Sequence, residues 1–158
     1  LDITITIISQ TNKALLRSGL RDSYLVAYTG KLGNSKKDLQ RLYNLGTLHK
    51  KSKFVNIELR DKFVDNSSRF LSSGMDISDG LFFFLDKLAS VNRVGFKFKK
   101  KIPKNIACSG EEYEMLVAFD KRYKKSLIRR AAQSRTKLNI FAKSTRAKYT
   151  SRCKSHHF

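Results

Sequence analysis

The chain has 158 residues, of which 41% are hydrophobic and 11% aromatic, and its formal net charge at pH 7 is +20. This composition fits a single folded domain with a proper core and excludes an intrinsically disordered chain. No run approaches the roughly 18 apolar residues of a transmembrane helix, so a membrane-spanning role is excluded. The positive charge favours an anionic partner such as nucleic acid, a phosphorylated metabolite or acidic lipid, but a lysine-rich surface without a specific role explains it equally well.

Apolar residues recur with two periods along the chain, and each period predicts one kind of element. Alternating or short continuous apolar runs predict strands over residues 1–8, 24–28, 94–98, 114–119 and 138–141. Apolar residues at i, i+3 and i+4 predict helices between Asn34 and Gly46 and over residues 57–71, 81–91 and 123–132. The helix over residues 81–91 has the strongest signal, because its apolar residues form one wide face.

Strands and helices alternate along the chain, and no Gly/Ser-rich linker divides it. The sequence therefore predicts a single α+β domain over residues 1–158, a two-layer domain with one mixed sheet and helices on one face. The chain lacks an initiating methionine and starts within its first predicted strand, so we expect it to be a piece of a longer protein.

The cysteines and the first residues indicate the cytoplasm. Residues 1–8 carry no basic region of the kind that opens a signal peptide. Cys108 and Cys153 are the only cysteines, and their number and spacing mark neither a secreted disulfide framework nor a metal site. We therefore expect a chain that works in a reducing cytoplasm.

Residues 74–80, Gly-Met-Asp-Ile-Ser-Asp-Gly, place two carboxylates three positions apart directly before a predicted helix. Mg²⁺ takes oxygen ligands, usually one or two carboxylates with phosphate oxygens and waters. Asp76 and Asp79 are therefore candidate metal ligands, and Ser78 is a candidate phosphate contact together with the first N–H groups of the helix. The alternative is that Ser78 or Asp79 only caps the helix, since both residue types are preferred N-caps.

Residues 109–114, Ser-Gly-Glu-Glu-Tyr-Glu, are a second dense polar segment. Three carboxylates before an apolar strand would form an acidic island in a basic chain, suited to a cationic ligand group or a metal. The alternative is a solvated start of a strand. Arg17 is either a phosphate contact or a surface arginine, and its spacing alone favours the surface.

Four motifs in this chain resemble, in the correct order, those of thiamine-monophosphate kinase. Residues 74–81 are similar to the family's Met-Ile-Asp-Ile-Ser-Asp-Gly-Leu, and residues 108–116 to its Gly-Gly-Glu-Asp-Tyr-Glu-Leu-Leu. Residues 15–33 resemble its Leu-x-Arg-Ser-Gly segment and the strand and loop Tyr-Val-Thr-Gly-x-Leu-Gly-Asp. His157-Phe158 is similar to a His-Phe near the family's C-terminus. The resemblance covers most of the chain.

This resemblance implies the C-terminal domain of an enzyme of the aminoimidazole-ribonucleotide synthetase-like superfamily. Such an enzyme uses ATP and Mg²⁺ to phosphorylate thiamine monophosphate to thiamine diphosphate. By resemblance, Asp76 and Asp79 bind Mg²⁺, Arg17 and Ser78 contact ATP, and Glu111 contacts thiamine monophosphate, while no catalytic residue is assigned. The family's N-terminal domain, which supplies most of the nucleotide site and the dimer core, is absent here. We expect it as a partner in cis or in trans, and a homodimer when the protein is complete.

The chain departs from the family pattern at the predicted substrate segment, whereas the two predicted metal ligands match it. Glu112 replaces the motif's Asp, Ser109 replaces its first Gly, and the connection from Pro103 to Ser109 is short. Because the N-terminal domain is missing, we expect little or no kinase activity from the isolated chain.

Two alternatives remain open at this point. The first is a non-catalytic anion- or nucleic-acid-binding module on the same fold, suggested by the stretch from Lys121 onwards, which has 13 basic residues and no acidic one. No recognised nucleic-acid motif supports it, so such binding would be nonspecific electrostatics. The second is a structural remnant that packs on a separately encoded domain.

Overall fold

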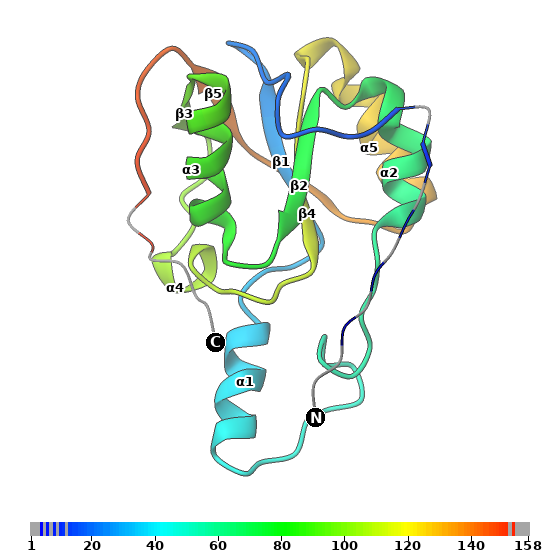
Figure 1. The fold of residues 1–158 in the computed structure, drawn as a ribbon, viewed down its shortest axis with the longest axis vertical. Coiled ribbons are helices and arrows are strands. Elements are labelled where there is room, and N and C mark those ends of the chain that lie inside the picture. Colours follow the sequence, from blue (N-terminus) through cyan, green and yellow to red (C-terminus); the bar gives the residue numbers. More distant parts are fainter. Residues whose placement is uncertain are drawn as a thin grey trace.

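The computed structural model describes residues 4, 6, 8, 10, 11, 13–151 and 153, and a five-stranded sheet of order β2-β4-β1-β5-β3 forms its centre (Figure 1). The strands are β1 (Leu25–Thr29), β2 (Ser73–Ile77), β3 (Gly95–Phe98), β4 (Glu114–Phe119) and β5 (Leu138–Thr145). The helices are α1 (Ser35–Tyr43), α2 (Asp61–Ser67), α3 (Leu81–Asn92), α4 (Lys104–Ala107) and α5 (Lys124–Gln133), with 3-10 turns at Ser68–Phe70 and Lys121–Tyr123. The α+β class expected from the sequence is confirmed.

All neighbouring strands of the sheet run antiparallel, so the expectation of a mixed sheet is wrong. The chain passes through α3 between β2 and β3 and through α5 between β4 and β5, and the two strands of each pair run in the same direction. However, β1 lies between β4 and β5, and three strands lie between β2 and β3. The sequence pattern indicates the strand–helix–strand units but not the strands inserted within them.

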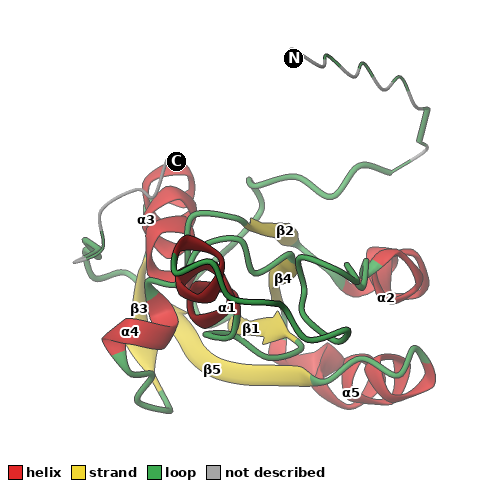
Figure 2. Cartoon of the chain, turned by 90° about the horizontal axis from the view of Figure 1, so that it is seen from below, coloured by secondary structure: helices red, strands yellow, loops and turns green. Residues whose placement is uncertain are grey.

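Helices cover both faces of the sheet, so the expected two layers with helices on one face are also wrong (Figure 2). On one face, α3 buries Leu81, Leu85 and Leu88. On the other face, α2 and α5 bury Phe63 and Leu127. Strands β1 and β4 lie inside the sheet and are buried on both sides, which explains why their sequences read as continuous apolar runs.

Some predicted elements differ from those observed. The helix predicted over residues 57–71 is shorter, because α2 starts at Asp61 and a 3-10 turn follows it. β2 was not predicted, since its Ser-Gly-Met-Asp-Ile sequence has little strand propensity. The strand predicted over residues 1–8 and the His157-Phe158 motif lie largely or wholly outside the described residues. None of the described helices is long and apolar enough to cross a membrane.

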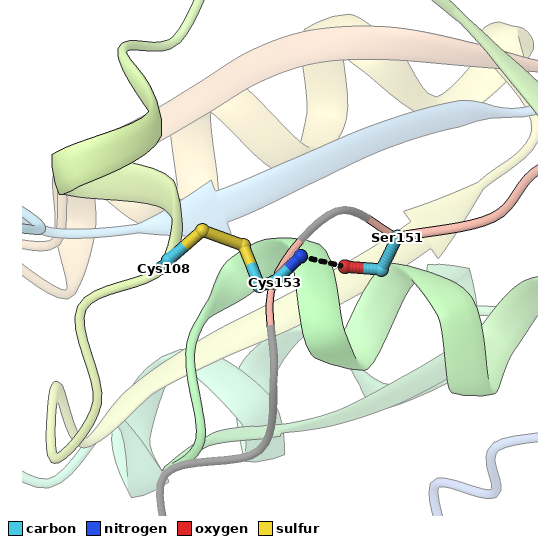
Figure 3. The surroundings of a disulfide bond; sticks show 3 residues. All are labelled: Cys108, Ser151 and Cys153. Atoms are coloured by element: carbon cyan, nitrogen blue, oxygen red, sulfur yellow. Dashed lines mark hydrogen bonds between the residues drawn. A yellow bond between two sulfur atoms is a disulfide. The ribbon is translucent and has the colours of Figure 1, made fainter.

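The segment after β5 runs back along α3 and joins the end of α4 through a disulfide bond (Figure 3). The Ser151 N–H donates to Asp86 Oδ1 of α3 at 3.0 Å, and Cys153 is then bonded to Cys108. The two cysteines are 45 residues apart in sequence and their Cα atoms are 5.6 Å apart. Sequence spacing gave no sign of this pair, because only the path of the segment over α3 brings the cysteines together.

Candidate functional site

The two polar segments meet at the end of the sheet where β2 stops and β4 starts. The last residue of β2, Ile77, pairs with the first residue of β4. The Glu111 N–H donates to the Ser78 carbonyl at 2.5 Å, and the next two N–H groups donate to the Ile77 carbonyl at 3.2 Å. The candidate site therefore consists of two joined loops, residues 76–80 and residues 108–113.

The two aspartates expected to bind Mg²⁺ lie on the first loop and its strand. Asp76 is exposed on β2, and Asp79 is half-buried before α3. Within the described residues neither carboxylate accepts a hydrogen bond or forms an ion pair, and no group of three His, Cys, Asp or Glu side chains is placed to hold a metal. Mg²⁺ needs only one or two carboxylates when phosphate oxygens and waters complete its shell. The pair therefore fits a metal that is held jointly with a phosphorylated ligand.

Gly80, rather than a capping side chain, shapes the start of α3. It occupies the N-cap position with a φ of 104°, and no side chain caps the helix. A Cβ at Gly80 would lie 3.1 to 3.2 Å from backbone atoms of Ala107 and Cys108, so glycine allows the end of α4 to approach α3. The capping alternative for Ser78 and Asp79 is therefore wrong, and both side chains remain available to a ligand.

Two of the three carboxylates in the second segment are buried and paired with protein groups. Of the acidic cluster expected there, only the Glu111 carboxylate remains for a ligand. Glu112 is 1% exposed, and its Oε1 accepts hydrogen bonds from the Gly33 N–H and the Ser109 hydroxyl, both at 2.6 Å. Lys53 Nζ lies 3.0 Å from Glu112 Oε2. Because all these partners are protein groups, Glu112 fixes the turn rather than binding a ligand.

Glu114 is also 1% exposed and is held by cations and a hydroxyl. Arg60 donates to its carboxylate through Nε at 2.7 Å and Nη2 at 2.9 Å, Thr29 donates at 2.7 Å, and Lys53 Nζ lies 3.3 Å away. Burial raises the pKa of Glu114, but the hydrogen bonds from Arg60 and Thr29 and the two positive charges outweigh it and lower the pKa below its ordinary value. Sequence reasoning missed Arg60 and Lys53, since a pair 54 or more residues apart leaves no local pattern.

Glu111 is the carboxylate of the second segment that remains accessible to a ligand. Its φ is 53° and that of Tyr113 is 52°, a strained conformation for residues with a side chain. The Tyr113 hydroxyl donates to Glu111 Oε2 at 2.5 Å, and this hydrogen bond raises the pKa of Tyr113 to about 12. Glu111 lines a cavity of about 170 Å³ together with Tyr43 of α1 and Phe54. A carboxylate beside aromatic side chains fits a cationic ring.

Arg17 lies apart from the other candidate residues. Its carbonyl accepts a hydrogen bond from Asn92 Nδ2 at 2.9 Å, which places its backbone at the C-terminal end of α3. Ser78 precedes the N-terminal end of the same 12-residue helix, roughly 17 Å away along the helix axis. The structure therefore brings Asp76, Ser78, Asp79 and Glu111 to one end of the sheet, but not Arg17.

A larger cavity of about 690 Å³ opens beside Glu112 and Glu114, and its wall carries six Lys and Arg side chains against four carboxylates, Asp38, Glu58, Glu112 and Glu114. Those basic residues are Lys31, Lys37, Lys51, Lys53, Arg60 and Lys137. In the part of the chain that the structure describes, no carboxylate pairs with Lys31, Lys37, Lys51 or Lys137. The acid-free stretch singled out in the sequence contributes only Lys137, so the basic cavity is built mainly by the N-terminal half.

No protein-family model matches the chain, and no curated protein sequence matches it significantly. Solved structures do match. Thiamine-monophosphate kinase from Stenotrophomonas maltophilia superposes with a TM-score of 0.73 at 16% identity over 87% of this chain and 52% of that one. AaThiL, complexed with AMPPCP and TMP, superposes with a TM-score of 0.70 at 18% identity over 87% and 50%. Escherichia coli HypE superposes with a TM-score of 0.69 at 10% identity over 87% and 48%.

These comparisons show that the chain has the α+β fold of a part of thiamine-monophosphate kinase and of HypE. The chain spans about half the length of the solved proteins that it matches. Two proteins with different names, thiamine-monophosphate kinase and HypE, thus share this fold.

Removing Arg60 should strongly destabilise the domain, because it leaves the buried Glu114 carboxylate with fewer partners. We expect Arg60→Met to lower the free energy of unfolding by about 3 kcal/mol, measured by urea denaturation. Glu58→Gln is the matched control, since Glu58 also pairs with Arg60 at 3.1 Å but its side chain is 70% exposed. The control should change stability by less than about 1 kcal/mol. Equal effects of the two variants would contradict the role given to Glu114.

The lowered pKa of Glu114 also predicts how stability depends on pH. A carboxylate with a lowered folded-state pKa stabilises the fold above its unfolded pKa, near 4.5, and this contribution is lost as the pH falls through the folded pKa. The stability of the wild type should therefore fall more steeply below pH 4.5 than that of Glu114→Gln. Glu58→Gln should keep the wild-type slope. Parallel profiles for all three proteins would show that Glu114 is not the titrating group.

Proposed function

We propose that the chain is the C-terminal part of a cytoplasmic thiamine-monophosphate kinase, a phosphotransferase that moves the γ-phosphoryl group of ATP to thiamine monophosphate. The observation that carries this proposal is the hydrogen bond from the Glu111 N–H to the Ser78 carbonyl. It joins the proposed metal and nucleotide loop to the proposed substrate loop. One of the matching structures carries the name thiamine-monophosphate kinase, and another, AaThiL, was solved as a complex with AMPPCP and TMP. The four sequence motifs favour this activity over that of HypE.

In this proposal the first loop handles the phosphates. Asp76 and Asp79 would hold Mg²⁺, which neutralises charge on the phosphate oxygens when it is bound. The Ser78 hydroxyl and the first N–H groups of α3, which no side chain of the described residues caps, would orient the transferred phosphoryl group. Arg17, at the far end of α3, would contact a part of the nucleotide remote from Ser78.

The second loop would hold the acceptor. The Glu111 carboxylate is opposite in charge to the thiazolium ring of thiamine monophosphate, and the Tyr113 hydroxyl restrains it through their hydrogen bond. A phosphate oxygen of the acceptor would attack the γ-phosphorus, and ADP would leave. Positioning and charge neutralisation account for most of the catalysis in such transfers, so no side chain of this chain is needed as a nucleophile.

An N-terminal domain, in cis or in trans, would complete the site and form the homodimer. Two aspartates alone do not make a full Mg²⁺–nucleotide site, and β2, which carries Asp76, is an edge strand of the sheet. The Gly74 N–H of this edge already donates to the Leu16 carbonyl at 2.9 Å, so another domain would cover the sheet and add ligands at the Asp76 end of the strand.

A non-catalytic anion-binding module is the second candidate, favoured by the basic cavity of about 690 Å³. Its lysines would attract nucleic acid or phosphorylated ligands without base-specific contacts. Binding to single-stranded RNA and DNA of varied sequence, measured by fluorescence anisotropy at 50 and 200 mM salt, separates the two candidates. Sequence-independent binding that disappears at the higher salt would leave the kinase as the better account.

Thiamine diphosphate formation tests the kinase directly. We expect no product from the chain with thiamine monophosphate and Mg-ATP, and product when an N-terminal domain of the family is added, because that domain supplies the missing part of the nucleotide site. Product from the chain alone would contradict the need for a second domain. No product in either mixture would contradict the kinase itself.

Mutation of the aspartates should weaken Mg-nucleotide binding without unfolding the domain. We expect Asp79→Asn to bind Mg-ATP at least 10-fold more weakly in the two-domain mixture, measured by isothermal titration calorimetry. Its free energy of unfolding should change by no more than about 0.5 kcal/mol, since within the described residues the carboxylate accepts no hydrogen bond and forms no ion pair. The exposed Asp65 on α2 provides the matched control as Asp65→Asn. Unchanged affinity in Asp79→Asn would exclude this residue as a metal ligand.

A further inference from the structure

The disulfide bond connects the proposed substrate loop to the C-terminal segment (Figure 3). Cys108 stands three positions before Glu111 and lines the same cavity of about 170 Å³. Its backbone lies against Gly80, at the start of α3. Cys108 is therefore in contact with both loops of the candidate site.

Few other contacts hold the C-terminal segment near this loop. Tyr149 packs against Phe96 with ring centroids 5.3 Å apart, and the Ser151 N–H binds Asp86. Both contacts attach the segment to β3 and α3, not to α4 or the loop. Among the contacts of the described residues, the disulfide is the connection that joins this segment to the substrate loop.

The bond is accessible, and it is unexpected in the proposed compartment. Both cysteine residues are partly exposed rather than buried in the core, as thiol–disulfide exchange with an external thiol requires. Cytosolic proteins keep their thiols reduced, and the disulfides found there are mostly transient ones with a catalytic or redox-sensing role. The sequence contains no third cysteine, so this pair cannot exchange with another thiol of the same 158 residues.

We propose that the Cys108–Cys153 disulfide is a redox-sensitive clasp that holds the wall of the Glu111 cavity in its ligand-binding form. The proposal rests on the kinase function for the identity of the ligand, thiamine monophosphate, and for the cytoplasmic setting. When the bond is closed, the loop before Glu111 is fixed to α3 through the C-terminal segment. When it is open, that wall is released, while the sheet and the Glu112 and Glu114 ion pairs remain.

The chemistry is a two-electron thiol–disulfide exchange with a cellular dithiol. One thiolate of the dithiol attacks a sulfur of the disulfide, the sulfur–sulfur bond breaks, and the other cysteine leaves as a thiolate. The second thiol of the dithiol then resolves the mixed disulfide. The protein ends with two cysteine thiols, which take up two protons, and the dithiol is oxidised to a disulfide. Oxidised dithiol drives the reverse reaction.

The test compares the oxidised chain, the chain reduced with dithiothreitol, and Cys153→Ser. The serine variant opens the clasp at the end remote from the cavity, so it replaces no residue of the cavity wall and leaves Cys108 as a thiol, as in the reduced chain. Backbone order parameters from nitrogen-15 relaxation should fall at residues 108–111 in the reduced chain and in Cys153→Ser, and stay constant in β1 and β4. Thiamine monophosphate should bind at least 10-fold more weakly to both open forms, and dithiothreitol should not change the affinity of Cys153→Ser.

Order parameters and affinities that do not depend on the redox state would overturn the clasp. Alkylation and mass spectrometry in glutathione buffers give a second measurement, and thiols that stay unpaired in oxidised glutathione would also overturn it. The proposed function fails separately. Thiamine monophosphate could bind to neither the oxidised nor the reduced chain while the order parameters of residues 108–111 still fall on reduction. That result would support the clasp and contradict thiamine monophosphate as its ligand.

Discussion

The buried Glu114 carboxylate is the constraint on which the candidate site depends. It joins β4 to Thr29 of β1, to Arg60 before α2, and to Lys53 in the loop between α1 and α2. A Cβ on Gly30 would overlap this carboxylate, so the chain after β1 must turn at a glycine. A buried charge with fewer partners would be strongly destabilising, and the four segments are therefore fixed relative to one another.

The acidic residues at this end of the sheet divide into two groups. Glu112 and Glu114 are buried, and their partners are all protein groups. Asp76 and Asp79 have no partner among the described residues, and Glu111 keeps only the Tyr113 hydroxyl. The paired carboxylates hold the loops in place, and the unpaired ones can bind a cation or a positively charged ring. The unpaired carboxylates are therefore stronger support for a site that binds a phosphorylated ligand through a metal than the positive net charge of the chain is.

The sequence predicted the parts of the structure that depend on local patterns. The apolar face of α3 followed from its i, i+3 and i+4 spacing, and β1 and β4 from their apolar runs. The candidate residues Asp76, Ser78 and Asp79 were visible as a motif, and Glu111 was placed by resemblance. The structure brings these four residues to one end of the sheet.

The remaining features depend on long-range contacts that leave no local pattern. The sheet is fully antiparallel because β1 lies between β4 and β5, and three strands lie between β2 and β3. Its two faces carry different helices, and the disulfide depends on the path of the segment after β5. The roles of Lys53 and Arg60 arise from pairs formed across more than 50 residues. The Leu-x-Arg-Ser-Gly motif predicted that Arg17 contacts ATP but could not predict its position. The fold places Arg17 at the opposite end of α3 from Ser78.

In the proposed enzyme, one loop binds the metal nucleotide and the other binds the acceptor. The most direct test is the steady-state kinetics of the two-domain mixture with Glu111→Gln and Asp79→Asn. We expect Glu111→Gln to raise the KM for thiamine monophosphate and to leave the KM for Mg-ATP unchanged. Asp79→Asn should raise the KM for Mg-ATP and leave the KM for thiamine monophosphate unchanged. If both variants change the two KM values equally, the division of the site between its two loops is contradicted.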